Sequence, residues 1–213
     1  MYKLIIFDLD GTLLNTIDDI CESLNIALEE NGLEKVTVDK CKYMVGNGAK
    51  VLIEKAVKNH EHLFEKVMNG YLCNYEKLQR NKTKPYNGIV DTVNKLKDKG
   101  LKLAILSNKP HNDTLNVVDW FFGKDLFDVV MGKKENNNPK PSIDGCFEIM
   151  DSLNIRSDIL YVGDTAVDMQ TARNAGYTSV AVTWGFRLKE ELKDSDYMID
   201  EPLELIKIVE GKR

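Results

Sequence analysis

Short apolar runs recur along the chain and are separated by stretches with helical periodicity. The apolar runs cover residues 3–7, 101–106, 127–131, 159–162 and 178–182, with a weaker one at 197–199. Several are apolar on both faces, which is typical of parallel strands covered by helices on either side. Residues 89–99 and 142–153 have helical spacing; the first stretch ends at Gly100 and the second follows Pro141. This order predicts an α/β fold, a doubly wound parallel sheet with a Rossmann-like core.

Residues from about 15 to 80 follow a different pattern, in which helical periodicity dominates and strands are hardly indicated. Thr16 is placed to cap a helix that ends at Asn31-Gly32. Further helices are expected on both sides of the glycine-rich break at 46–48 and from about 61 to 79.

The length of this helical block indicates a separate domain. A crossover between neighbouring strands of a compact α/β unit usually needs one helix, and this block holds several. We therefore expect a helical domain at residues 15–82, inserted into an α/β core formed by residues 1–14 and 83–213.

Composition narrows the possible partners. The chain has 213 residues, 43% of them hydrophobic, which is enough to bury a core without a disulfide or a metal staple. A net charge of −5 argues against binding to a nucleic-acid backbone, and no apolar run is long enough to span a membrane. The first residues enter a strand pattern with no secretory signal, and the four cysteines form no CxxC pair, so we expect a cytoplasmic protein.

Two carboxylates mark the end of the first apolar run. Asp8 and Asp10 are two residues apart, so both side chains point the same way if the strand geometry continues through Leu9. They lie at the carboxyl end of the strand, where open parallel sheets bind ligands. Two like charges at this spacing favour a hard cation such as Mg²⁺ between them. The alternative is a strand end in which both carboxylates accept hydrogen bonds from backbone amides.

Two other predicted strands also end in polar residues. Ser107, Asn108 and Lys109 follow the second strand and offer a hydroxyl and an amide to a phosphate, although a solvated turn is the simpler interpretation. Asp164 follows the fourth strand, and Asp168 comes four residues later, where a helix would place both carboxylates on one face.

Lys140 adds a positive charge to this set. It lies just before an expected helix start, where backbone N–H groups favour an anion, although a loop lysine is usually only solvated. Four such features at separate strand ends are unlikely to coincide by chance. Together they predict a magnesium-dependent phosphate site.

The segments FDLDGTLLNT, SNK, KP and GDTAVD resemble, in order and spacing, the four motifs of the haloacid dehalogenase superfamily of phosphotransferases. The helical block after the first motif is similar to the cap domain of one class of that superfamily. Within it, the segments YMVGNGAKVLIEKA, SNKP and VGDTAVDMQTARNAGYTSVAVTWG look most like phosphoglycolate phosphatases.

The resemblance implies a role for each matching residue. Asp8 would be the nucleophile that forms an aspartyl-phosphate, and Asp10 the general acid and base. Mg²⁺ would be held by the carboxylates of Asp8 and Asp164, the backbone carbonyl of Asp10, and Asp168 directly or through water. The phosphoryl group would be held by Ser107, Asn108 and Lys140, and Gly11 would allow the tight exit from the strand.

The helical domain is expected to contact the substrate through its glycine-rich turn. Gly46, Asn47, Gly48 and Lys50 are the candidates, because a glycine-rich helix start can approach an anionic group closely. A plain turn between helices explains the same residues equally well. Trp184, Gly185, Phe186 and Arg187 follow the fifth strand. They either border the pocket or only pack, and packing is the simpler interpretation.

Several functions share these motifs. The leading hypothesis is a Mg²⁺-dependent phosphatase acting on a small phosphorylated molecule, as a monomer or homodimer without nucleic-acid or membrane partners. The alternatives are a pyrophosphatase, a sugar-phosphate phosphatase or a phosphomutase. A dehalogenase attacks carbon and does not need an acid at Asp10. A phospho-receiver or other binding module leaves the complete acid, hydroxyl and lysine set unexplained.

Overall fold

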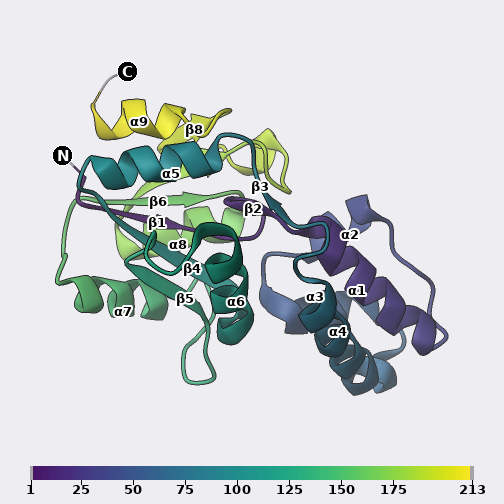
Figure 1. Ribbon diagram of the computed structural model, residues 1–213. Coiled ribbons are helices and arrows are strands. Elements are labelled where there is room, and N and C mark those ends of the chain that lie inside the picture. The colour runs from purple at the N-terminus through teal and green to yellow at the C-terminus, as the bar shows by residue number, and fades with distance from the viewer. Residues whose placement is uncertain (1, 212–213) are drawn as a thin grey trace.

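A six-stranded parallel sheet forms the centre of the molecule (Figure 1). The computed structural model describes residues 2–211. The strand order is β5-β4-β1-β6-β7-β8, and every neighbouring pair is parallel. The strands of this sheet are β1 (Leu4–Phe7), β4 (Lys102–Pro110), β5 (Val129–Lys133), β6 (Ile159–Gly163), β7 (Thr178–Val182) and β8 (Tyr197–Ile199). This topology confirms the predicted α/β fold.

Helices cover both faces of the sheet because alternate strand residues are apolar on each side. Ile5 and Phe7 of β1 pack in one cluster with α5, α6 and α9, whereas Leu4 and Ile6 pack in another with α7 and α8. The helices of the core are α5 (Ile89–Asp98), α6 (His111–Phe122), α7 (Asp144–Leu153), α8 (Ala166–Ala175) and α9 (Glu204–Val209). A short 3-10 helix, η2, spans Lys189–Glu191.

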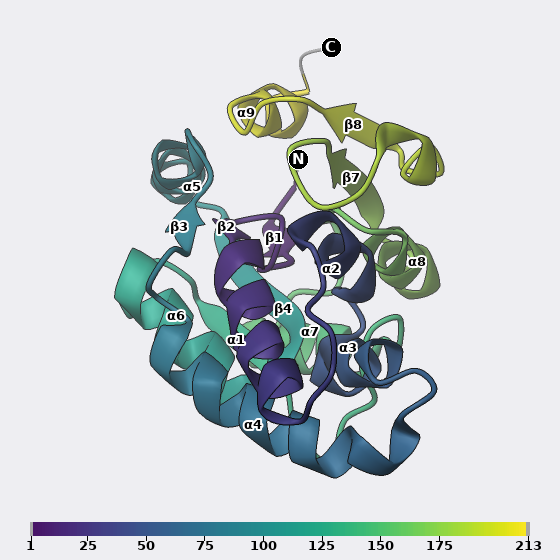
Figure 2. The same cartoon turned by 90° about the vertical axis from the view of Figure 1, so that its right-hand side faces the viewer.

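A group of helices lies beside the sheet, next to the carboxyl ends of its strands (Figures 1 and 2). It consists of α1 (Ile17–Glu30), α2 (Val38–Met44), α3 (Gly48–Ala56), the 3-10 helix η1 (Glu61–Leu63) and α4 (Phe64–Leu78). These helices share their own apolar cluster, to which α1 contributes Leu24 and Leu28. We call this group the helical unit; the predicted domain boundaries at residues 15–82 remain a prediction.

Two antiparallel segments connect the helical unit to the core. β2 (Leu14–Asn15) pairs with β3 (Lys84–Pro85). The fully buried Asp19 carboxylate accepts hydrogen bonds from the backbone N–H groups of Lys82 and Thr83, at 2.8–3.1 Å. A carboxylate on the first turn of α1 thus holds the returning segment against the outgoing one.

The helix after Thr16 begins at Ile17 as predicted, but two details of the predicted helix starts differ from the structure. Thr16 precedes α1 but accepts no capping hydrogen bond, because its backbone already has helical angles. The stretch expected to be helical from residue 142 instead begins at Asp144. Ser142 lies in a turn, where its backbone N–H donates to Pro139 and its hydroxyl to the Asp144 carboxylate.

Strand β4 is longer than predicted and carries three site residues. The apolar run ends at Leu106, but the strand continues to Pro110, with a register shift against β5 between these two positions. Ser107, Asn108 and Lys109 therefore belong to a buried strand end and not to a solvated turn. Strand β5 begins two residues later than its apolar run.

Across residues 2–211, none of the helices combines the length and the apolar character that crossing a membrane requires.

Candidate active site

Asp8 lies directly after β1 and is 6% exposed. Its backbone N–H donates to the carbonyl of Val162 on the neighbouring strand β6, at 2.9 Å, so the strand pairing fixes its position. The Lys140 ammonium lies 2.7 Å from the Asp8 carboxylate and 2.7 Å from that of Asp168. One buried lysine thus connects the residue after β1 to the first turn of α8.

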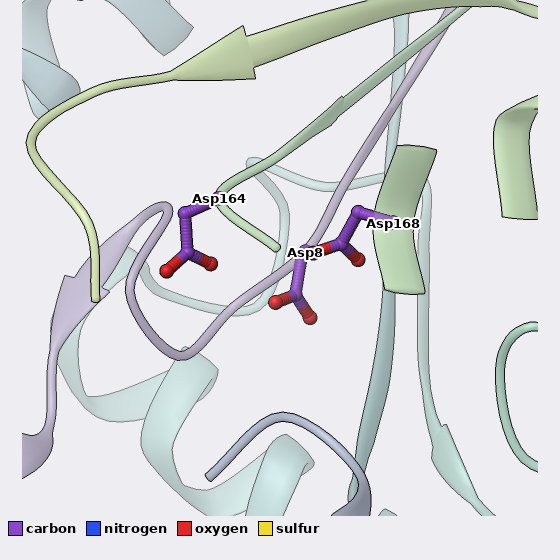
Figure 3. Close-up of side chains that lie close together, drawn as sticks. All are labelled: Asp8, Asp164 and Asp168. Carbon is purple, nitrogen blue, oxygen red and sulfur yellow. The ribbon is translucent and has the colours of Figure 1, made fainter. Parts of the chain in front are cut away.

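Asp164 and Asp168 approach Asp8 from the end of β6 and the start of α8 (Figure 3). The Asp164 carboxylate accepts a hydrogen bond from the Thr12 hydroxyl at 3.2 Å and from the Phe186 backbone N–H at 2.7 Å. Asp168 forms a capping box with Thr165, whose hydroxyl donates to the carboxylate at 2.6 Å. Each carboxylate is therefore held by its own partners.

Two glycines leave room for the Asp164 side chain. A Cβ on Gly11 would lie 2.3 Å from an Asp164 carboxylate oxygen, and Gly11 also has a φ of +91°. A Cβ on Gly185 would lie 2.2 Å from the Cβ of Asp164. The tight exit predicted at Gly11 thus exists, and its consequence is space for a carboxylate.

The three carboxylates fit a hard cation. Oxygen atoms of Asp8, Asp164 and Asp168 all lie within 4.8 Å of one another, and all three residues are buried. Burial raises the pKa of Asp8 to about 7, although Lys140 favours its charged form. Burial also raises the pKa of Asp164 well above its ordinary value, with Asp168 and Asp8 adding to the effect. A divalent cation relieves this repulsion, and all-oxygen ligands suit Mg²⁺.

Lys140 stays charged within this cluster. Burial lowers the pKa of its ammonium, but the attraction of Asp168 and Asp8 outweighs burial, and the pKa is raised well above its ordinary value. Its location two residues before Ser142 matters less than predicted, because α7 begins only at Asp144. The ion pairs to the two aspartates hold this lysine in place, rather than a helix start.

Asp10 pairs with a lysine whose role was not predicted. Both of its carboxylate oxygens accept hydrogen bonds from the Lys109 ammonium, at 2.8 and 2.9 Å. The Lys109 side chain is 4% exposed, and its ammonium lies 4.6 Å from the centre of the Tyr75 ring. Burial lowers the pKa of Lys109, but Asp10 outweighs burial and raises it. The general-acid candidate is therefore held by a buried cation.

Ser107 and Asn108 have different surroundings. Ser107 is buried beside the cavity, and its hydroxyl accepts a hydrogen bond from the Lys109 backbone at 3.2 Å. The Asn108 side chain donates to the carbonyls of Gly46 and Lys140, both at 3.1 Å, and accepts from the Lys140 N–H at 2.7 Å. Asn108 therefore ties the Lys140 loop to the helical unit, a use of its side chain that differs from the predicted phosphate contact.

The four candidates in the helical unit separate into two pairs. Gly46 and Gly48 line the cavity above Asp8 and Asp10, with φ angles of +110° and +84°. Asn47 is not among the lining residues, and it provides no side-chain cap for α3. The Lys50 side chain is 77% exposed and lies 4.0 Å from Glu54 on the outer surface of the same helix.

The cavity lies between the core and the helical unit and measures about 40 Å³. Its core wall includes Asp8, Asp10, Ser107 and Lys109, and its opposite wall includes Leu52 and the Tyr71–Tyr75 turn of α4. A volume of this size holds only about three waters. The cavity is therefore narrow where the helical unit faces Asp8 and Asp10.

Three features of the site were not predicted from the sequence. They are Lys109, the Thr12 hydroxyl on Asp164, and the segment Phe186–Arg187, which contacts both Asp164 and the helical unit. The local sequence around a lysine or arginine at a strand end does not reveal which group its side chain will contact. The Ser107-to-Lys109 end of β4 was the one signal that pointed toward Lys109.

Several known proteins are similar to this chain in sequence and in fold. Residues 5–182 match the family described as haloacid dehalogenase-like hydrolase. A phosphoglycolate phosphatase from Aquifex aeolicus (strain VF5) is 32% identical, covering 98% of this chain and 97% of that protein. One from Aliivibrio fischeri (strain ATCC 700601 / ES114) is 28% identical, covering 93% and 92%.

A crystal structure from Lactobacillus delbrueckii subsp. bulgaricus ATCC BAA-365, provisionally described as a phosphoglycolate phosphatase, superimposes with a TM-score of 0.93. It is 30% identical, and the match covers 98% of each chain. The similarity therefore includes both the core and the helical unit.

Proposed function

Because the chain belongs to the haloacid dehalogenase-like hydrolase family, we propose that it hydrolyses phosphate monoesters with Mg²⁺ through an aspartyl-phosphate on Asp8. The observation that carries the proposal is the convergence of Asp8, Lys140, Asp164 and Asp168 from two strand ends, one loop and one helix. A binding module has no need for a nucleophile, a paired acid and a buried lysine at one site.

The carboxylates of Asp8 and Asp164 and the backbone carbonyl of Asp10 would hold Mg²⁺, with Asp168 supporting them. Bound Mg²⁺ supplies positive charge beside the phosphoryl oxygens and keeps Asp8 ionised. The grouping of the three carboxylates within 4.8 Å supports this assignment.

In the first half-reaction, a carboxylate oxygen of Asp8 attacks phosphorus while the bond to the ester oxygen breaks. That oxygen leaves with a proton from Asp10, a contribution worth roughly 10²–10⁴ in rate. The Lys140 ammonium and the Ser107 hydroxyl hold the phosphoryl oxygens as their charge changes. One difficult displacement is thereby divided into two.

In the second half-reaction, Asp10 takes a proton from water as the water oxygen attacks phosphorus. The bond between phosphorus and Asp8 breaks, which releases inorganic phosphate and regenerates the carboxylate. Lys109 positions Asp10 for both proton transfers through its two hydrogen bonds, at 2.8 and 2.9 Å.

We propose that the helical unit, residues 15–82, acts as a cap domain that opens for the substrate and closes before the chemistry. Closure excludes water until the leaving group has left, which an aspartyl-phosphate requires. The paired segments β2 and β3 are its hinges, and Gly46 and Gly48 are its substrate-facing residues.

Phosphoglycolate is the substrate that we propose, because the relatives named above carry that activity in their names. We place the enzyme in the cytoplasm as a monomer or homodimer. Pyrophosphatase, sugar-phosphate phosphatase and phosphomutase activities are the alternatives.

A phosphate-release screen with Mg²⁺ tests the proposal. It compares phosphoglycolate, pyrophosphate, hexose phosphates and nucleoside monophosphates at equal concentration. We expect phosphoglycolate to be preferred by more than about tenfold in kcat/KM, the size of one or two well-placed contacts. A sugar isomer without free phosphate would indicate a mutase, and no turnover of any ester would overturn the proposal.

A further inference from the structure

The segment after β7 contacts both the predicted metal ligand and the helical unit. The backbone N–H of Phe186 donates to the Asp164 carboxylate at 2.7 Å. The side chain of the same residue is 6% exposed and packs into the apolar cluster of the helical unit, which includes Met44 and Val45. One residue of the core therefore contacts both the carboxylate cluster and the helical unit, which the proposed function moves apart when the cavity opens.

Arg187 extends this connection to the end of α2. Its guanidinium donates hydrogen bonds to the backbone carbonyl of Lys42 and, at 2.7 Å, to that of Val45. It also lies 5.6 Å from the centre of the Tyr43 ring, and its side chain is only 10% exposed. The carbonyls of the last helical turn have no partner within the helix, and a planar cation with several donors satisfies them well.

The turn that Arg187 binds is also held from the other side. The Asn108 side chain donates to the Gly46 carbonyl at 3.1 Å. A Cβ on Gly46 would lie 3.7 Å from the Arg187 guanidinium, so the two anchors meet at the same turn. This turn carries Gly46 and Gly48 onto the cavity. Its position over Asp8 therefore depends on contacts from two different strand ends.

We propose that Arg187 is a positioning residue that couples closure of the helical unit to Mg²⁺ binding at Asp164. The inference rests on the Mg²⁺ site of the proposed function and adds a link that the mechanism itself does not require. The Asp164 carboxylate orients the Phe186 N–H, and the adjoining Arg187 lies against the end of α2. A Mg²⁺ ion held by Asp164 would fix this carboxylate, and with it the segment that carries Arg187. Coupling is reciprocal, so a closed helical unit also increases the affinity for Mg²⁺.

Mg²⁺ titration of Arg187→Ala, without substrate, tests this coupling. Isothermal calorimetry measures the affinity for Mg²⁺, and hydrogen exchange measures the protection of backbone amides in residues 42–48. In the natural protein we expect Mg²⁺ to slow exchange in this turn. In Arg187→Ala we expect about fivefold weaker Mg²⁺ binding and no Mg²⁺-dependent protection, although no metal ligand has been changed.

Two further variants keep the test decisive. Arg187→Lys retains the positive charge but loses the planar guanidinium, so its affinity for Mg²⁺ should lie between those of the natural protein and Arg187→Ala. This variant also provides a result if Arg187→Ala folds poorly. Arg156→Ala is the matched control, because this arginine forms an exposed ion pair with Asp151 away from the cavity. It should bind Mg²⁺ as the natural protein does.

Each outcome decides something. Equal Mg²⁺ affinity and equal protection in the natural protein and Arg187→Ala would overturn the coupling while leaving the proposed function intact. A natural protein that neither binds Mg²⁺ nor releases phosphate from any ester would overturn both. Mg²⁺-dependent protection without phosphatase activity would overturn the proposed function alone.

Discussion

The two walls of the cavity are built in opposite ways. The core wall is dominated by charged and polar groups; Asp8, Asp10, Ser107, Asn108 and Lys109 each have a hydrogen-bond partner, and Pro110 and Asp113 complete the wall. The wall from the helical unit is apolar, aromatic or backbone: Ile20, Val45, Gly46, Gly48, Ala49, Leu52, Tyr71, Leu72 and Tyr75. This difference indicates that the core supplies the reacting groups and that the helical unit forms the apolar wall that encloses the substrate.

This contrast has a physical basis. Buried charges need fixed partners, and a rigid parallel sheet supplies them at neighbouring strand ends. A wall that must open and close gains from apolar contacts, which do not leave unpaired charges when they separate. Changes in the core should therefore alter the rate of the chemical steps, and changes in the helical unit should alter substrate binding. The predictions below run from the largest expected effect to the smallest.

Asp8→Asn should lower kcat by at least about 10⁴-fold, because the amide is a poor nucleophile and no other group is placed to replace it. The variant should still fold, since Lys140 retains its ion pair with Asp168. Phosphate release at saturating substrate measures the loss, and thermal unfolding provides the control for the fold. More than about 1% residual turnover would contradict the role of nucleophile.

Asp10→Asn should slow poor leaving groups by roughly 10²–10⁴, but an activated leaving group such as nitrophenol far less. The reason is that only a poor leaving group needs a proton as it departs. Rates for an alkyl phosphate and for nitrophenyl phosphate, measured on the same preparation, give the ratio. An equal loss for both substrates would rule out general-acid catalysis.

Gly11→Ala should weaken Mg²⁺ binding by roughly 10–100-fold, because the new Cβ would lie 2.3 Å from an Asp164 carboxylate oxygen. Gly32→Ala is the matched control: its φ of +71° carries similar backbone strain, but no atom lies within 4 Å of the added Cβ. Calorimetric titration with Mg²⁺ compares the two. If they lose affinity equally, strain and not the carboxylate explains the effect.

The affinity for Mg²⁺ should rise about tenfold from pH 6 to pH 8. Metal-free Asp8 has a pKa of about 7, so it is mostly protonated at pH 6, and Mg²⁺ must displace that proton. The same shift makes the metal-free protein less stable as pH rises from about 4 to about 7, since the folded state binds more protons than the unfolded one. Titrations and thermal unfolding at each pH measure both effects; a pH-independent affinity would contradict the assignment.

The helical unit should respond through substrate binding alone. Gly48→Ala should raise KM several-fold with little change in kcat, because its Cβ would lie 3.0 Å from the Asn108 carbonyl. Lys50→Ala should change neither constant by more than about twofold, since its side chain faces solvent. Steady-state kinetics distinguish the two. A large loss of kcat in either variant would contradict the claim that the helical unit acts only on substrate binding.

The strand ends could be predicted from the sequence because two simple rules locate them. Apolar runs mark parallel strands, and their carboxyl ends lie on one edge of the sheet. These rules place Asp8 and Asp164 side by side, because β1 and β6 are neighbours in the strand order. They do not place Lys140, which reaches Asp8 and Asp168 from the loop between β5 and α7.

The remaining features depend on tertiary contacts that no local pattern encodes. Lys109 reaches Asp10 only because β4 continues beyond its apolar run to Pro110. Arg187 reaches α2 only because the segment after β7 runs back along the helical unit. The glycine-rich turn was located correctly, but the phase of α3 directs Lys50 outward, and a one-residue change in the helix start would alter that direction.

The transfer of a phosphoryl group to Asp8 is the central claim, and chemical trapping tests it most directly. Enzyme, Mg²⁺ and phosphoglycolate are mixed, quenched in acid within milliseconds and treated with borohydride, which reduces an acyl phosphate to an alcohol. Mass spectrometry then locates the changed residue. The account predicts homoserine at Asp8, dependent on both substrate and Mg²⁺; an unmodified Asp8 during active turnover, or a modification at Asp10, would contradict it.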